Sequence, residues 1–312
     1  MAHGTHDHAA DPRNADILIG INDDVVHRDR AVVSVFDSGF MLGDGVWEGI
    51  RVHGGTPLFL DEHLRRLDEG AKAIDLDIGR SHDQLAAMIH ATLTANGMDD
   101  ADGVHIRLMV SRGVKSTPYQ DPRFTISPPT IVIIPEYKEP VDETTTGGLR
   151  LHTVSTRRGR PDVQDPKWNS HSKLNCISAC IQATDAGADE GLMLDPQGFV
   201  ATCNSTHFFI VRHPDGPDGP AEVWTSTGDY CMPGITRRNV LRLCAEHGVT
   251  ARERNFSVTE CYGASEAFVT GTFAGIAPVT EIDGRTIGAG ARGPMVERLQ
   301  RWYVALLDRE CG

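Results

Sequence analysis

A polar stretch near the middle of the chain, Glu136–Gly148 (EYKEPVDETTTGG), is the feature that most constrains its architecture. The stretch contains proline and ends in two glycines, a composition typical of a connection between folded parts. The chain has 312 residues, and a single domain usually has roughly 100–150. We therefore expect two domains, a small one over residues 1–135 and a large one over residues 149–312, joined by a linker over residues 136–148.

Both halves alternate strand-like and helical segments. The pattern predicts a small α+β domain and a large α/β domain. Residues 1 to about 14 are rich in His and Asp, and we expect them to form a mobile polar arm. The expected strands are Gly45–His53, Val104–Ser111, Thr130–Pro135, Leu149–Thr156, Gly191–Leu194, Phe208–Val211 and Ala267–Thr270, and the expected helices begin near Asp61, Asp83, Ser172, Thr236 and Pro294.

The charge and the cysteines narrow the possible partners. Thirty basic against 43 acidic residues give a net charge of −13, which argues against nucleic-acid binding. No apolar run approaches the ~20 residues of a membrane helix, and the first residues lack the apolar core of a signal peptide. The seven cysteines are scattered and form no CxxC pair, which predicts reduced thiols, a cytoplasmic location and no metal site.

Three segments predict binding of an anion. The sequence Gly234–Arg237 (GITR) opens a helix, where unpaired N–H groups and the helix dipole favour a phosphate at Ile235 and Thr236. Thr272 follows a buried strand in a Gly-Thr turn, where a hydroxyl and an N–H group converge. In the first half of the chain, Arg66 lies on an amphipathic helix and offers a bidentate guanidinium.

Taken in order, four segments resemble the class IV aminotransferases, the fold-type-IV family that includes branched-chain, D-amino-acid and (R)-amine transaminases and aminodeoxychorismate lyase. The resemblance extends from about Ile17 to Asp283. It implies a two-domain fold of the D-amino-acid aminotransferase type, pyridoxal 5′-phosphate (PLP) as cofactor and a homodimer. The segments are Asp44–Arg51 (DGVWEGIR), Glu62–Leu67 (EHLRRL), Gly234–Arg237 (GITR) and Thr270–Val279 (TGTFAGIAPV).

The resemblance assigns roles to particular residues. It implies that Arg66, Ile235, Thr236 and Thr272 surround the cofactor phosphate. The activity it implies is transfer of an amino group between an amino acid or primary amine and a 2-oxo acid, in ping-pong half-reactions with a lysine that forms a Schiff base with PLP.

Two lysines compete for that role. The family places the lysine about 21–22 residues before a glutamate that matches Glu190 here. Lys167 lies 23 residues before Glu190 and Lys173 lies 17 before it. Because loops absorb small insertions more easily than helices lose turns, we expect Lys167. Lys173 stays open, since Lys-Leu-Asn is similar to the family's local pattern, and so does the reading in which neither lysine is catalytic.

One position departs from the family pattern. Thr202 stands where relatives carry the glutamate that pairs with the pyridine nitrogen, and His207 stands where they carry an asparagine. A carboxylate keeps that nitrogen protonated, whereas a hydroxyl offers only a neutral hydrogen bond. The departure leaves two alternatives to the transaminase: a lyase of the aminodeoxychorismate type, and a relative that has lost PLP.

Two residues of the first half are candidates for the substrate side. Trp47 occupies the aromatic position of the Asp44–Arg51 segment, which the resemblance directs towards the substrate. Arg107 lies in the strand His105–Val110, where alternation puts it on one face with His105 and Met109. We expect Arg107 to bind a substrate carboxylate, with an ordinary surface arginine as the alternative.

Overall fold

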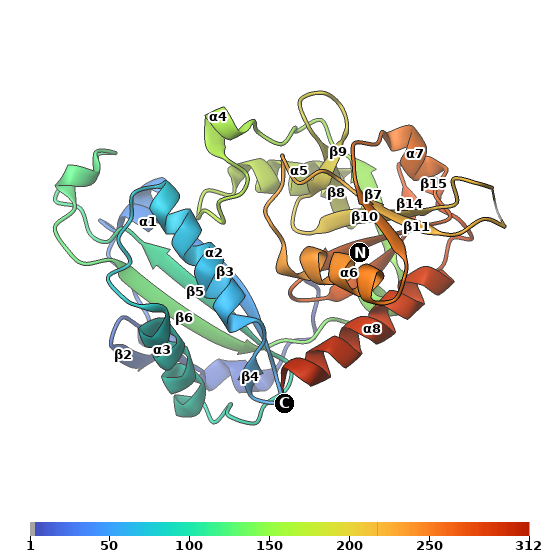
Figure 1. Ribbon diagram of the computed structural model, residues 1–312. Coiled ribbons are helices and arrows are strands. Elements are labelled where there is room, and N and C mark those ends of the chain that lie inside the picture. Colours follow the sequence, from blue (N-terminus) through green and yellow to red (C-terminus); the bar gives the residue numbers. More distant parts are fainter. Residues whose placement is uncertain (1–3, 217, 312) are drawn as a thin grey trace. The chain divides into compact units, whose positions relative to one another are not determined.

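The computed structural model describes residues 4–216 and 218–311, which form two compact units (Figure 1). The large unit comprises residues 4–9, Pro140–Lys167 and Leu174–Arg309. The small unit comprises Ala10–Glu139, Trp168–Lys173 and residues 310–311.

The small unit is built on a six-stranded antiparallel sheet in the order β2-β1-β6-β5-β3-β4. Four short helical segments and two longer helices complete it among the described residues, and the longer pair, α2 and α3, packs on the sheet. The strands are β1 (Leu18–Ile21), β2 (Asp24–His27), β3 (Gly45–His53), β4 (Thr56–Pro57), β5 (Val104–Ser111) and β6 (Thr130–Tyr137), and the α-helices are α1 (Ser38–Leu42), α2 (Leu60–Ala73) and α3 (His82–Ala95).

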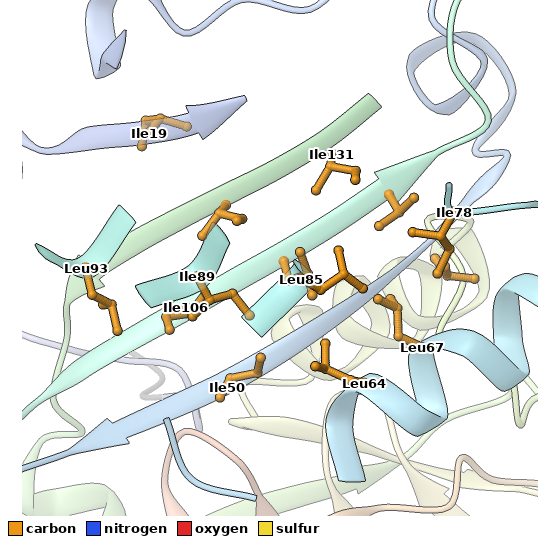
Figure 2. Packing of buried hydrophobic residues seen from close by; sticks show 14 of the residues in the cluster. Ile19, Ile50, Leu64, Leu67, Ile78, Leu85, Ile89, Leu93, Ile106 and Ile131 are labelled. Carbon is orange, nitrogen blue, oxygen red and sulfur yellow. The ribbon is translucent and has the colours of Figure 1, made fainter. Parts of the chain in front are cut away.

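One hydrophobic core holds the helices of the small unit to its sheet. Leu64 and Leu67 of α2 point towards β3, with Leu64 near Ile50, and Leu85 and Ile89 of α3 lie over the central strands (Figure 2). Burial in β5 alternates, with Ile106 and Leu108 inward, as the sequence pattern predicts. The same alternation puts Arg107 on the opposite face of the sheet from this core.

The large unit is built on a nine-stranded mixed sheet in the order β12-β11-β10-β13-β14-β7-β8-β9, with β15 paired to β14. β7–β8 and β11–β12 are parallel pairs, each joined by a helical crossover, as expected for an α/β domain. The strands are β7 (Leu149–Thr153), β8 (Glu190–Leu194), β9 (Val200–Cys203), β10 (His207–Arg212), β11 (Glu222–Thr225), β12 (Thr250–Glu253), β13 (Glu266–Gly271), β14 (Gly275–Ile282) and β15 (Arg285–Thr286), and the helices are α4 (Pro161–Gln164), α5 (Leu174–Asp185), α6 (Ile235–Glu246), α7 (Val258–Tyr262) and α8 (Pro294–Glu310).

The borders of the units differ from the expected domain borders in the middle of the chain. β6 continues through Tyr137, and the border falls between Glu139 and Pro140, inside the expected linker. Residues 143–147 of that linker form a helical turn beside β14. Residues 168–173 belong to the small unit because they pair with β3. The backbone N–H of Trp47 donates to the carbonyl of Asn169, and the backbone N–H of His171 donates to the carbonyl of Gly45, both at 2.9 Å.

The expected mobile arm also has defined contacts where it is described. Residues 4–9 lie against the large unit, whereas Pro12–Asp16 forms a 3-10 turn of the small unit. Residues 1–3 of the expected arm lie outside the described residues. Among the helices of residues 4–216 and 218–311, none is long and apolar enough to cross a membrane.

Candidate active site

The residues expected to bind an anion in the large unit lie in and near the first turn of α6. The helix begins at Ile235, and Gly234 before it has no side chain to cap the first N–H groups. Ile235 and Thr236 are both buried. A Cβ at residue 234 would collide with the ring of His207, so only glycine allows this approach. The helix therefore presents unpaired N–H groups and its positive dipole end among buried residues.

A second strand brings hydroxyl groups to the same region. Thr270 in β13 pairs with His207 in β10, whose ring Nε2 donates to the carbonyl of Met232 at 2.7 Å. The hydroxyl of Thr270 is buried and has no hydrogen-bond partner within the described chain. Thr272 follows in the turn between β13 and β14 and is half-buried. An orphaned buried hydroxyl beside an uncapped helix start matches a site that an external acceptor or donor completes.

Thr202 lies in β9, close to the same strands. Its hydroxyl is buried and donates to the carbonyl of Thr206, the residue before His207, at 2.7 Å. A hydroxyl has one proton to donate, so Thr202 keeps only acceptor capacity for any further partner. His207, which the sequence identified only as a departure, thus lies next to the residue that accepts from Thr202, pairs with Thr270 and closely approaches Gly234 at the start of α6.

The small unit contains a separate cluster around Trp47. The guanidinium carbon of Arg107 lies 3.7 Å from the centre of a Trp47 ring, and Nζ of Lys173 lies 5.3 Å from it. The indole N–H of Trp47 donates to the carbonyl of Ser170 at 3.1 Å, which ties the ring to the segment that carries Lys173. Two cations therefore border one aromatic ring, which stabilises each by a cation–π contact.

Arg107 is the less satisfied of these two cations. Its guanidinium has no hydrogen bond or ion pair with any residue of the described chain. Burial lowers its pKa, and only the more distant charge of Glu136 opposes that effect. A partly buried guanidinium without a carboxylate is arranged to accept an anionic group from outside the chain.

The two candidate lysines have different surroundings. Lys167 is exposed, and its backbone N–H donates to the Asp165 carboxylate at 2.9 Å. Lys173 is half-buried, and its Nζ donates to Oδ1 of Asn169 at 3.0 Å. The preference for Lys167, which rests on spacing, remains a prediction. Lys173 has a fixed, half-buried amine beside Trp47.

Arg66 is not among the residues that contact Trp47. It belongs to a buried ionic cluster between α2 and β3. Its Nε and Nη2 donate to the two oxygens of Glu48 at 2.9 and 2.5 Å, and Nδ1 of His63 donates to Glu48 at 2.6 Å. Burial raises the pKa of Glu48, but the charge of Arg66 and the hydrogen bonds from His63 and Arg66 leave it lowered. Burial lowers the pKa of His63, which favours the neutral ring.

The sequence analysis named Arg66 as a phosphate ligand, which stays a prediction, and did not name Glu48 or His63 as its neighbours. Glu48 and His63 belong to two of the segments that carry the family resemblance, Asp44–Arg51 and Glu62–Leu67. Their pairing is not evident from the sequence, because it joins a strand to a helix that follows it. Within the described residues, no three His, Cys, Asp or Glu side chains are grouped to hold a metal ion.

Comparisons with known proteins identify the family of the chain. A family model described as amino-transferase class IV matches residues 45–282. The chain is 40% identical over 297 residues to the branched-chain-amino-acid aminotransferase-like protein 2 of Arabidopsis thaliana, covering 95% of this chain but spanning only about half (51%) of that relative. It is 32% identical to the branched-chain-amino-acid aminotransferase of Pseudomonas aeruginosa, with 94% of each chain covered.

A solved structure shares the fold as well. The crystal structure of the T.th. branched-chain amino acid aminotransferase with pyridoxamine 5′-phosphate superposes with a TM-score of 0.84. Its sequence is 29% identical, and the match covers 94% of this chain and 95% of that chain. The agreement therefore includes both units and nearly the whole described sequence.

Proposed function

The chain belongs to the class IV aminotransferase family, and on that premise we propose that it uses PLP to move an amino group from an amino acid or primary amine to a 2-oxo acid. The relatives reported above are named aminotransferases, and one solved relative holds pyridoxamine 5′-phosphate. These names support transamination over the lyase and over a relative without the cofactor.

The uncapped start of α6, with the partnerless buried hydroxyl of Thr270 on the neighbouring strand, is the observation that carries this proposal. Unpaired N–H groups of Ile235 and Thr236, together with the hydroxyls of Thr270 and Thr272, fit a phosphate, because a phosphate presents several strong acceptor oxygens. The residues present thus fit the phosphate end of PLP. Arg66 is proposed as its charged ligand, with its guanidinium orientation fixed by Glu48.

When bound, PLP supplies a conjugated ring that withdraws electrons from the bonds at the substrate's α-carbon. The ring nitrogen is proposed to meet Thr202, whose hydroxyl is committed as a donor to Thr206 and has only lone pairs left to offer. A neutral hydroxyl acceptor stabilises a protonated nitrogen less than a carboxylate does. We therefore expect slower transfer than in an enzyme with an acid at this position.

We propose Lys173 as the lysine that bonds to the cofactor and moves the proton. Its Nζ is held by Asn169 and lies over Trp47, so it occupies a defined and partly dry place. A fixed amine serves better as a proton acceptor and donor at one carbon than the exposed amine of Lys167 does. Spacing in the sequence supports Lys167 instead, so an experiment must compare the two.

The Trp47 cluster is proposed to bind the substrate carboxylate. Arg107 has its guanidinium against the indole and lacks a carboxylate of the described chain to pair with. A bidentate contact with a carboxylate would satisfy that charge and orient the substrate. The names of the relatives support branched-chain amino acids as donors, with D-alanine and an (R)-amine as the rival donors to test.

We further propose that the protein is a homodimer. In the small unit, two neighbouring segments expose large apolar side chains. The segments are joined by a hydrogen bond from the backbone N–H of Lys115 to the carbonyl of Phe36, at 2.9 Å. Large apolar side chains exposed on segments that lie side by side are typical of an interface. The patch residues are Val32, Val35, Phe36, Phe40, Tyr119 and Ile126.

Light scattering of Phe40→Asp tests this assembly. Unchanged protein is expected to have the mass of two chains and the variant that of one, with Val25→Asp, an exposed position outside the patch, as control. A single-chain mass for the unchanged protein would refute the dimer. We also propose a cytoplasmic location, because all seven cysteines are free thiols.

Absorbance and covalent trapping test the cofactor and its lysine together. Purified protein with PLP is expected to absorb near ~410–420 nm and to lose that band when a donor amine is added. Borohydride reduction followed by mass spectrometry is expected to place the cofactor on Lys173. A label on Lys167 would overturn the choice of lysine, and protein that gains no band with added PLP would overturn the proposed function.

Turnover distinguishes the reaction type. Amino transfer is expected to require a 2-oxo acid acceptor, with a branched-chain amino acid as the better donor. Release of pyruvate without any acceptor would instead indicate a lyase.

A further inference from the structure

The amino-terminal segment 4–9 lies on the large unit and contacts two of its turns. Thr5 is 3% exposed, although the segment around it is polar. Its hydroxyl donates to Oε2 of Glu190 at 3.3 Å and lies 3.2 Å from the hydroxyl of Ser205. A threonine of a terminal arm is thus buried against an acid 185 residues further along the chain.

Glu190 connects this arm to the turn between β9 and β10. One oxygen accepts the backbone N–H and the hydroxyl of Ser205, at 2.8 and 2.5 Å, and the other accepts the hydroxyl of Thr206 at 2.9 Å. Glu190 is 1% exposed, so every one of these donors offsets the cost of burying its carboxyl. The carbonyl of Thr206 in turn accepts the hydroxyl of Thr202.

The next residue of the arm contacts the other turn. The ring of His6 stacks on Phe273, with 5.6 Å between ring centres and 12° between planes, and His8 meets the same ring edge-on at 6.4 Å. Phe273 follows Thr272 directly and is 3% exposed. The two turns also touch each other, because Cγ2 of Thr206 lies 3.4 Å from the place of a Cβ on Gly271.

We propose that residues 4–9 hold the turns 203–206 and 271–275 in the geometry that binds the cofactor phosphate and ring, with Thr5 and His6 as positioning residues. The inference rests on the proposed function, because the affinity for the cofactor depends on the positions of Thr202 and Thr272. Neither arm residue touches the reaction. Each acts through a neighbour, Thr5 through Glu190 and His6 through Phe273.

The double variant Thr5→Val/His6→Ala tests this role in the full chain. Losing one hydrogen bond to a buried acid and one ring stack is expected to raise the Kd for PLP about tenfold, measured by titration of protein fluorescence. The matched control is Thr250→Val, an exposed threonine at the β12 edge of the same sheet, whose Kd is expected to stay unchanged.

Hydrogen exchange on the cofactor-free proteins separates positioning from general stability. The double variant is expected to exchange faster at amides 203–206 and 271–275 and as before in β11 and β12. Equal exchange in those turns, or an unchanged Kd, would overturn the inference. Faster exchange throughout the large unit would also overturn it, since the arm would then support the whole fold. Thr5→Ser keeps the hydroxyl and is expected to restore the Kd.

The two proposals fail in different ways. Unchanged protein that binds no PLP would refute the proposed function, while the exchange experiment would still report whether the arm holds the two turns. Normal PLP binding by both the unchanged protein and the double variant would refute the arm's role alone.

Discussion

Two arginines of the small unit, Arg66 and Arg107, lie in opposite electrostatic surroundings. Arg66 is 8% exposed and shares the Glu48 carboxylate with His63, so its charge is neutralised inside the chain. Arg107 lies 3.7 Å over Trp47 and has no ion pair with a residue of the described chain. The first arrangement fixes the orientation of a guanidinium, and the second leaves a guanidinium without an acidic partner in the described chain.

The comparison separates stability from binding. Removing one member of a satisfied buried cluster leaves the others without partners, and the fold bears that cost. Removing a cation that has no partner leaves nothing unpaired, so the cost appears only when an anion must bind. Variants of the two clusters should therefore move different measurements.

The largest effect is expected at the lysine of the Trp47 cluster. Lys173→Ala removes the amine that we assign to proton transfer and should lower the rate of amino transfer at least about 10³-fold. Lys167→Ala is the matched variant and should keep most of the rate, because that side chain is exposed. Steady-state kinetics with both variants decides between them. A large loss in Lys167→Ala alone would restore the preference from sequence spacing.

The Arg66 cluster should respond in stability. Glu48→Ala leaves Arg66 and His63 buried without their acceptor and is expected to lower the free energy of unfolding by about 3–5 kcal/mol. Urea denaturation measures the loss, with Glu69→Ala, an exposed acid on α2, as the control that should change little. Equal stability of Glu48→Ala and the control would mean that the cluster contributes nothing to the fold.

Arg107→Leu should show the converse. Loss of a charge-assisted contact of about 1.5–3 kcal/mol should lower kcat/KM for the amino acid by about 10- to 100-fold. The melting temperature should not fall, since no acid is left unpaired. Arg112→Leu is the contrast, because Arg112 pairs with Asp44 at 2.7 Å and should lose stability instead. A drop in stability of Arg107→Leu with normal kcat/KM would identify Arg107 as a structural residue.

Local patterns predicted a large share of the fold. Alternation placed Arg107 on the face of β5 opposite Ile106, and the helix expected to begin near Asp61 is α2. The start of α6 at Ile235 followed from the Gly-Ile-Thr signal. Such features depend on neighbours within a few residues, so the sequence displays them directly.

Contacts between distant polar residues were not predictable in the same way. Nothing near Thr5 indicates Glu190, and nothing in the 168–173 segment indicates that it pairs with β3 and leaves the large unit. Hydrogen bonds of this kind depend on where the completed sheets place their edges. The choice between Lys167 and Lys173 stays a prediction for the same reason, because spacing along the chain does not show which unit the segment around each lysine packs against.

The smallest expected effect is the pH dependence of the Arg66 cluster. Burial lowers the pKa of His63 from its usual 6.5, so below that pH the unfolded chain takes up a proton that the folded chain resists. Stability should therefore fall with acid by at most about 1.4 kcal/mol per pH unit from this residue. The pKa of Glu48, lowered from 4.5, acts in the same direction at lower pH, because its ionised form is the one that the fold stabilises.

His63→Gln isolates that contribution. The glutamine amide can still donate to Glu48 but does not titrate, so the slope of unfolding free energy between about pH 5 and 7 should become flatter than in the unchanged protein. Urea denaturation at a series of pH values measures both slopes. Parallel slopes would show that His63 has the same pKa in the folded and unfolded chains. That result would contradict the effect expected from its burial.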